Sequence, residues 1–86
     1  MMTAIRSLID RELTLAVPAA EITPRADLYA LGLTSFGAVR LLLATEHEFN
    51  VELPREMLKR ETARSIEAIV QALQALRPPE EWREAA

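Results

Sequence analysis

Apolar residues recur at spacings of three and four in two stretches near the ends of the chain, which is the period of an amphipathic helix. The stretch 3–15 carries one stripe, formed by Ile5, Leu8, Ile9 and Leu13. The stretch 62–76 carries another, formed by Ile66, Ile69, Val70, Leu73 and Leu76. Thr3 and Thr62 stand where N-cap residues are expected. The pattern predicts two helices whose apolar faces share one core, the first ending before Val17-Pro18.

Residues 35–50 predict a further long helix, with two competing apolar stripes. One stripe consists of Ala38, Leu41, Leu42, Thr45 and Phe49, and the other of Phe36, Val39 and Leu43. Only the first stays apolar or small to the end of the helix, so we assign it to the core. The second stripe then has two interpretations. It either packs beneath the preceding connection or stays exposed as a surface for a partner.

The connections between these helices carry their own signals. Residues 17–34 contain Pro18 and Pro24, and Asp27 is expected to cap a short turn through Leu31 that Gly32 closes. Apolar residues should hold this connection on the bundle: Ile22, Leu28, Leu31 and Leu33. Residues 51–61 begin extended and turn at Pro54, with Met57 and Leu58 as expected apolar contacts. The periodicity predicts an all-α fold, a small helical bundle.

Composition narrows the class of protein. Eighty-six residues, half of them hydrophobic, make one small domain with a single core. We expect this domain over 1–78 and a flexible tail over 79–86, which contains Trp82. The chain has no cysteine for a disulfide or a Cys-based metal site, and its net charge of −3 argues against nucleic acid. The absence of a long apolar run or a signal segment favours a cytoplasmic protein without a membrane span.

The segment Leu31-Gly32-Leu33-Thr34-Ser35-Phe36 is the most informative part of the sequence. It places a hydroxyl at the start of the second long helix, where unpaired amides and the helix dipole favour an anion. Taken alone, Ser and Thr before an apolar helix are usually caps. Thr34 can supply that cap, which leaves Ser35 free. His47 lies about 18 Å along the same helix and cannot act as a base on Ser35. We expect His47 to be solvated, and we expect the domain to have no catalytic residue and no metal site.

The same segment, together with the apolar helix that follows it, resembles the modification site of acyl carrier proteins, and the resemblance extends over 22–73. It implies the acyl-carrier-protein fold, with three long helices, one short helix and a long loop between helices one and two. It also implies that Ser35 is esterified with 4′-phosphopantetheine by a phosphopantetheinyl transferase. The domain would then hold an acyl or aminoacyl group as a thioester and present it to partner enzymes, without being an enzyme itself.

Departures from that pattern bear on the cargo. Thr34 and Phe36 replace the usual Asp and Leu around the serine, and Gly37 and Arg40 stand where fatty-acid carriers often have acidic residues. Like charges repel across an interface, so Arg40 disfavours a partner with a basic patch. The run from Ala26 to Phe36 resembles stand-alone bacterial carrier proteins that amino acid:carrier-protein ligases load.

The sequence therefore leaves two functional hypotheses. The first is a monomeric carrier protein whose partners dock beside Ser35, on residues that we expect to include Thr34, Phe36, Val39, Arg40, Leu43 and Met57. The second is a helical interaction module that binds a partner through the apolar face of the second long helix and carries no prosthetic group. The cluster Arg55, Glu56, Lys59, Arg60 and Glu61 is interpreted as a solvated face.

Overall fold

The computed structural model of the chain describes residues 2–76, and within that range all regular structure is helical. The α-helices are α1 (Met2–Glu12), α2 (Ser35–Phe49) and α3 (Ile66–Leu76). Three short 3₁₀ helices occupy the connections: η1 (Ala19–Glu21), η2 (Arg55–Met57) and η3 (Arg60–Ala63). The predicted all-α bundle is confirmed. The predictions for the tail 79–86 and for Trp82 lie outside the described residues.

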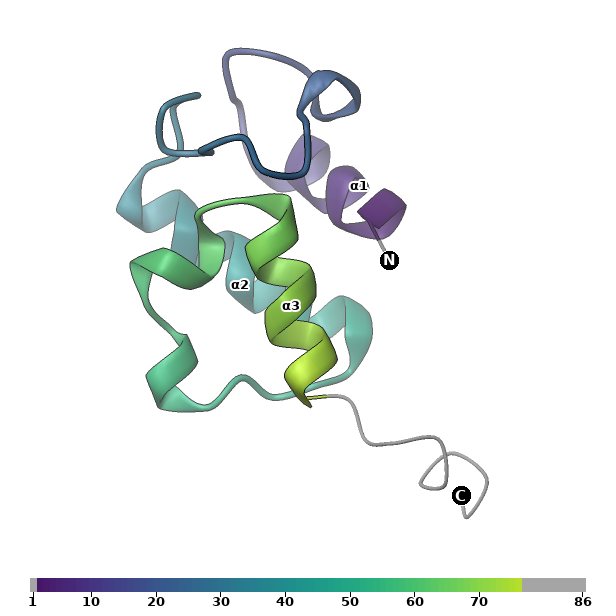
Figure 1. Cartoon of the computed structure of the whole chain (residues 1–86), viewed down its shortest axis with the longest axis vertical. Coiled ribbons are helices and arrows are strands. Elements are labelled where there is room, and N and C mark those ends of the chain that lie inside the picture. Colours follow the sequence, from purple (N-terminus) through teal and green to yellow (C-terminus); the bar gives the residue numbers. More distant parts are fainter. Residues whose placement is uncertain (1, 77–86) are drawn as a thin grey trace.

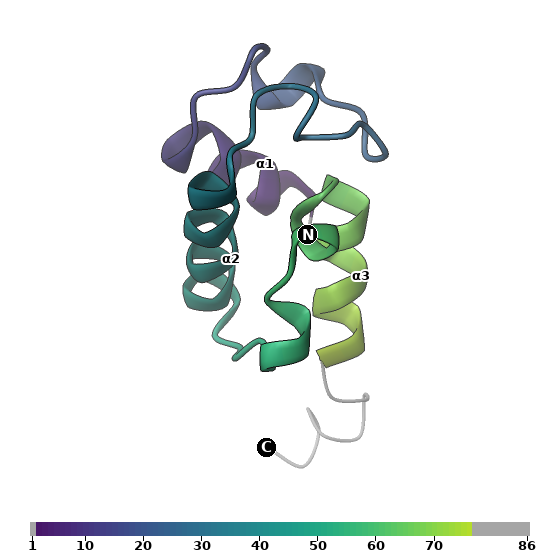
Figure 2. The same cartoon turned by 90° about the vertical axis from the view of Figure 1, so that its left-hand side faces the viewer.

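The three α-helices enclose one core. α1 contacts both α2 and α3, and η3 packs against α2 and against the start of α3. Figure 1 shows the long connection between α1 and α2 at the end of the molecule where α2 and α3 begin, and Figure 2 shows α2 and α3 with the η2–η3 segment between them. The predicted stripes supply most of the core, which includes Ile5, Leu8, Ile9, Leu41, Leu42, Ile66, Ile69 and Leu73.

Two stripe assignments on α2 are settled by burial. Leu41 and Thr45 are fully buried, and the Thr45 hydroxyl donates to the Leu41 carbonyl at 2.8 Å, which satisfies its polar group. Phe36 is 73% exposed and Val39 is 54% exposed. The interpretation that the second stripe packs beneath the connection is therefore wrong, and this stripe faces outward.

The long connection is held on both sides, which fixes where α2 begins. On the α1 side, the Arg6 guanidinium donates to the Ala19 and Ile22 carbonyls at 3.2 and 2.9 Å, and Asp10 accepts from the Ala19 amide at 3.0 Å. On the α3 side, the Leu28 amide donates to the Arg64 carbonyl at 2.8 Å. Ile22, Leu28 and Leu33 are buried as predicted. A rigid connection therefore delivers the chain to the first turn of α2.

Two predicted N-caps are wrong. α1 already begins at Met2, so Thr3 lies inside the helix. α1 also ends earlier than predicted, at Glu12, because the chain turns back to bring the Ala19 amide onto Asp10. Thr62 lies inside η3, where it is buried. Ser65 takes the capping role instead, since its hydroxyl accepts from the Ala68 amide at 3.0 Å.

Gly32 adopts a φ of +111°, and it closes the turns that follow Asp27. An added Cβ would meet no atom within 4 Å, so the requirement for glycine lies in the backbone conformation and not in space. Gly32→Ala is expected to lower the free energy of unfolding by about 1–3 kcal/mol, measured by urea denaturation. An unchanged urea midpoint would show that the turn relaxes without cost.

Candidate functional site

Ser35 is the first residue of α2, and its side chain is exposed. Thr34 precedes it in extended conformation, and its hydroxyl accepts from the Gly37 amide at 2.9 Å. The amides of Ser35 and Phe36 have no hydrogen-bond acceptor among the described residues. The predicted division of roles is therefore confirmed at this helix start: Thr34 caps the helix, and the Ser35 hydroxyl faces outward beside free amides.

Gly37 lets the start of α2 approach the connection closely. A Cβ at this position would lie 3.2 Å from Leu13 Cδ2, Leu33 Cδ1 and Thr34 Oγ1, which is closer than ordinary van der Waals contact. The glycine therefore packs the first turn of α2 tightly onto the residues that position Ser35.

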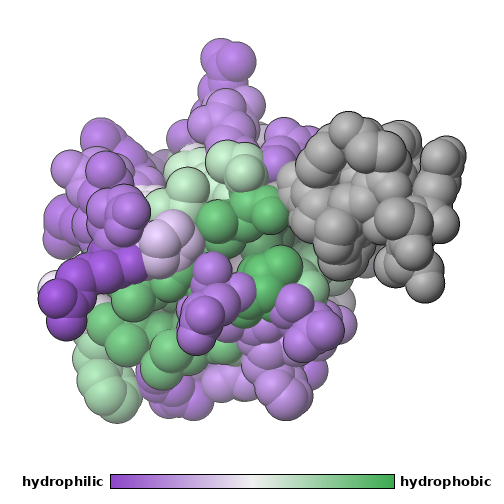
Figure 3. Space-filling view, turned by 90° about the horizontal axis from the view of Figure 1, so that it is seen from below, coloured by the Kyte–Doolittle hydropathy of each residue, from purple (hydrophilic) through white to green (hydrophobic). Residues whose placement is uncertain are grey.

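An apolar groove of about 310 Å³ begins beside Ser35, and we call it the Ser35 groove. α2 contributes Ser35, Ala38, Val39, Leu42 and Leu43, while the opposite wall is made by Tyr29, Leu58, Lys59 and Arg60. Three of these apolar side chains are about half exposed: Val39 at 54%, Leu43 at 54% and Leu58 at 49%. Figure 3 shows apolar side chains gathered at the surface between polar ones. The groove is large enough for a small ligand segment.

The structure divides the predicted docking residues into separate groups. Val39 and Leu43 lie in the Ser35 groove. Thr34, Phe36 and Arg40 line a second depression, of about 210 Å³, between α2 and the end of α1. Met57 packs partly buried against the core, and the neighbouring Leu58 occupies the groove instead.

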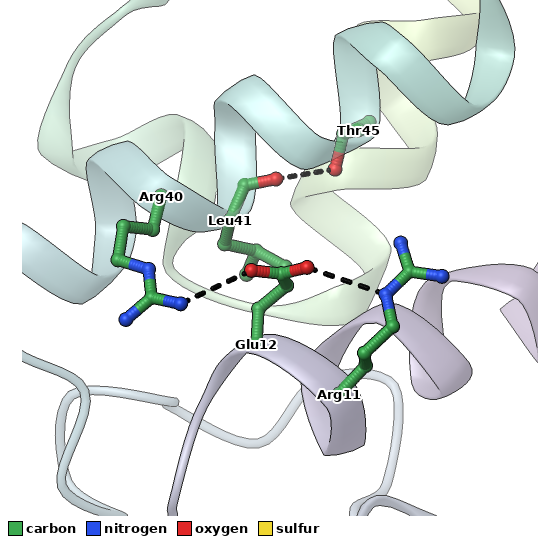
Figure 4. Close-up of polar contacts among 5 residues, drawn as sticks. All are labelled: Arg11, Glu12, Arg40, Leu41 and Thr45. Carbon is green, nitrogen blue, oxygen red and sulfur yellow. Dashed lines mark hydrogen bonds and ion pairs between the residues drawn. The ribbon is translucent and has the colours of Figure 1, made fainter.

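Arg40 of α2 forms an ion pair with Glu12, the last residue of α1. Its guanidinium donates to Glu12 Oε1 at 3.2 Å, and Arg11 donates to Glu12 Oε2 at 3.2 Å (Figure 4). The hydrogen bonds from Arg11 and then Arg40 hold the pKa of the Glu12 carboxyl below its ordinary value. The contribution of this carboxylate to stability is therefore present above its ordinary pKa and is lost as the pH falls through the lowered value. With two arginines and one carboxylate, the cluster keeps a positive charge beside α2.

Tyr29 and Arg60 form a contact that sequence reasoning missed. The Arg60 guanidinium lies 3.7 Å from the centroid of the Tyr29 ring, and the Tyr29 hydroxyl donates to the Arg60 carbonyl at 2.9 Å. Partial burial raises the pKa of the Tyr29 hydroxyl, and the Arg60 charge opposes that rise. The two residues lie 31 positions apart, and no local pattern connects them. Arg60 was interpreted as part of a solvated face; it is exposed, but it also lines the Ser35 groove.

The remaining predictions concern His47, metal binding and membrane-spanning helices. His47 is exposed and lines a shallow surface with Arg11, Glu12 and Arg40, far along α2 from Ser35. Within residues 2–76, no set of three or more metal-ligating side chains comes together. None of the helices in this range combines the length and hydrophobicity needed to cross a membrane.

Comparisons with known proteins point to one family. Residues 3–73 match a family model described as a phosphopantetheine attachment site. An aminoacyl carrier protein from Agrobacterium fabrum is 41% identical over 69 residues, which cover 80% of this chain and 83% of the relative.

Solved structures give the same picture. A carrier protein from Agrobacterium tumefaciens, crystallised with an engineered Bradyrhizobium japonicum glycine:carrier-protein ligase and AMP, superposes with a TM-score of 0.83 at 38% identity, covering 86% of this chain and 99% of that one. A glycylated carrier protein in complex with the Bradyrhizobium japonicum ligase gives a TM-score of 0.60 at 29% identity, covering 83% and 90%.

Proposed function

The chain belongs to the phosphopantetheine carrier proteins, which hold an acyl or aminoacyl group on this prosthetic arm and present it to partner enzymes, and we propose that Ser35 is the residue to which the arm is attached. The match to a phosphopantetheine attachment model does not favour the alternative of an unmodified interaction module. One observation carries the proposal: Ser35 is exposed at the first position of α2 while Thr34 makes the cap.

The residues around Ser35 fit a phosphodiester. Its single negative charge would lie at the N-terminus of α2, where such a charge is favoured by about 0.3–1 kcal/mol. The free amides of Ser35 and Phe36 and the cations Lys59 and Arg60 add to the positive potential there. When bound, the group supplies the thiol on which cargo is held as a thioester. The protein supplies the attachment oxygen and a groove beside it.

We assign no catalytic step to the domain itself. Among the described residues that line the Ser35 groove there is no carboxylate or imidazole that could act as a general base. We propose that a separate enzyme, a phosphopantetheinyl transferase, removes the hydroxyl proton. We propose a monomeric domain that acts in the cytoplasm, a location that the lack of cysteine fits.

We propose that the cargo is a small amino acid, loaded by an amino acid:carrier-protein ligase. Two observations support this choice. The relatives are aminoacyl carriers, one of them glycylated. The surface formed by α2 and the end of α1 also carries the Arg11–Glu12–Arg40 cluster, whose positive charge does not suit a partner with a basic patch.

Loading of the phosphopantetheinylated chain tests the cargo. The chain is incubated with ATP, glycine and the Bradyrhizobium japonicum glycine:carrier-protein ligase, and the intact mass is measured. We expect an increase of one glycyl group that hydroxylamine releases. Failure to load glycine or another small amino acid, together with loading of a fatty acid by an acyl ligase, would reject the aminoacyl assignment while leaving the carrier function in place.

Val39→Asp is expected to slow loading by the ligase at least tenfold, a loss of about 1.4 kcal/mol of interaction in the transition state. Val39 is 54% exposed in the Ser35 groove, so an aspartate there leaves the core intact but places a charge on an apolar contact surface. The measurement is the rate of mass increase with the variant already phosphopantetheinylated.

Gln71→Asp provides the matched control, because it makes the same charge change at an exposed position of α3 that does not line the groove. We expect this control to load at the rate of the unaltered protein. Equal rates for both variants would show that the exposed stripe of α2 takes no part in docking.

A further inference from the structure

The wall of the Ser35 groove opposite α2 carries two cations, Lys59 and Arg60. Both are exposed, and no carboxylate of the described residues lies within 4.0 Å of either. Four other arginines do pair with carboxylates in this range: Arg11, Arg25, Arg40 and Arg64. The groove therefore keeps a positive rim whose charge the described residues do not neutralise by a direct ion pair.

Arg60 is also held in place. The Tyr29 ring lies beneath its guanidinium, and the Tyr29 hydroxyl binds its carbonyl. Tyr29 itself is anchored by its amide, which donates to Asp27 Oδ1 at 2.9 Å. A guanidinium that stacks on a ring uses its face, so the N–H donors at its edge remain available. Arg60 is thus preorganised to bind an anion in its plane, such as a phosphate.

Two carboxylates also lie near Tyr29 and Arg60, in a pocket separate from the Ser35 groove. Asp27 and Glu61 line this pocket together with Tyr29, Arg60 and Arg64, and Asp27 accepts from the Tyr29 amide and lies 3.9 Å from Arg64. Neither carboxylate lines the Ser35 groove. An anion on Ser35 therefore adjoins a groove whose described lining residues include two cations and no carboxylate.

We propose that Arg60, assisted by Lys59, binds the phosphodiester that attachment places on Ser35, and that Tyr29 positions Arg60 for this contact. The inference rests on the proposed attachment at Ser35. It assigns the η2–η3 connection a role in holding the proximal end of the arm against the protein. Since the rim is exposed, the contact is electrostatic in part and weakens as salt rises.

The experiment compares the unmodified and the phosphopantetheinylated chain, with the adduct established by intact mass. Proton–nitrogen NMR spectra follow the backbone amides and the arginine Nε–Hε groups, and phosphorus NMR follows the phosphodiester. We expect attachment to shift the Nε–Hε signal of Arg60 and the amides of Lys59 and Arg60. The shifts should decline between 0.1 and 1 M salt, where the screening length falls from about 10 to about 3 Å.

Variants separate a specific contact from a general change. Arg60→Ala combined with Lys59→Ala should move the phosphorus signal toward that of free phosphopantetheine and leave the fold intact, since both side chains are exposed. Arg64→Ala is the control for the loss of a nearby positive charge: this arginine also lies in the connection before α3 but does not line the groove, so the phosphorus signal should not move. Arg60→Lys should restore part of the effect, because it keeps the charge without the planar fork.

The outcomes separate failure of the proposed attachment at Ser35 from failure of the proposed contact with Arg60 and Lys59. Absence of any adduct ends the proposed attachment and this inference with it. An adduct whose formation leaves the Arg60 and Lys59 signals unmoved, or a phosphorus signal that is the same in the double variant and in Arg64→Ala, overturns this inference alone.

Discussion

Ser35→Ala is expected to abolish attachment of phosphopantetheine completely when the purified chain is incubated with a phosphopantetheinyl transferase and coenzyme A. In the proposed attachment the acceptor oxygen is the Ser35 hydroxyl, and alanine removes it without disturbing the cap, which Thr34 supplies. Ser35 is exposed, so the variant should fold with a stability within about 0.5 kcal/mol of the parent chain. Intact mass reports the adduct, and circular dichroism reports the fold.

Thr34→Ala is the control for this prediction. It removes the hydrogen bond from the Gly37 amide and should cost about 0.5–2 kcal/mol of stability, yet it leaves the Ser35 hydroxyl in place. We expect full attachment in this variant at a temperature where it is folded. An adduct that persists in Ser35→Ala would move the attachment site to another residue.

Leu41→Ala is expected to give the largest loss of stability among single substitutions on α2, about 2–5 kcal/mol. Leu41 lies on the inner face of α2 and is fully buried in the core. Its truncation leaves a cavity beneath the helix that presents Ser35. A domain of this size has about 5–15 kcal/mol in total, so the loss is a large fraction of its stability. Urea denaturation measures the loss.

Leu43→Ala makes the same chemical change two residues further along α2. Leu43 is 54% exposed, so its truncation should change the free energy of unfolding by no more than about 0.5 kcal/mol. Similar losses for the two variants would contradict the assignment of the two stripes to the inner and outer faces of α2.

The stripes on α2 show what the sequence alone determines well. The stripe that contains Ala38, Leu41 and Thr45 stays small or apolar to the end of the helix, and these three residues are buried. The start of α2 was predictable for the same reason, because a glycine, a capping threonine and an apolar helix follow one another in a few residues. Such local signals depend on propensity and period, which a single sequence contains.

Features that depend on distant residues were not predictable. α1 stops early because Ala19 returns to Asp10, and η3 takes Thr62 into the core so that Ser65 caps α3. The pair of Tyr29 and Arg60 forms on one wall of the groove, between positions 31 residues apart in the sequence. The contacts of Ala19 with Asp10 and of Tyr29 with Arg60 join positions with no shared local pattern, so only the packed bundle brings them together.

The location of the prosthetic group on the chain is the most direct test of the central claim. The phosphopantetheinylated protein is digested, and fragmentation of the peptide that contains Thr34 and Ser35 assigns the added mass to one residue. We expect all of the added mass to lie on Ser35, at the first position of α2. Added mass on Thr34, on Ser7 or on Ser65, or no added mass at all, would contradict it.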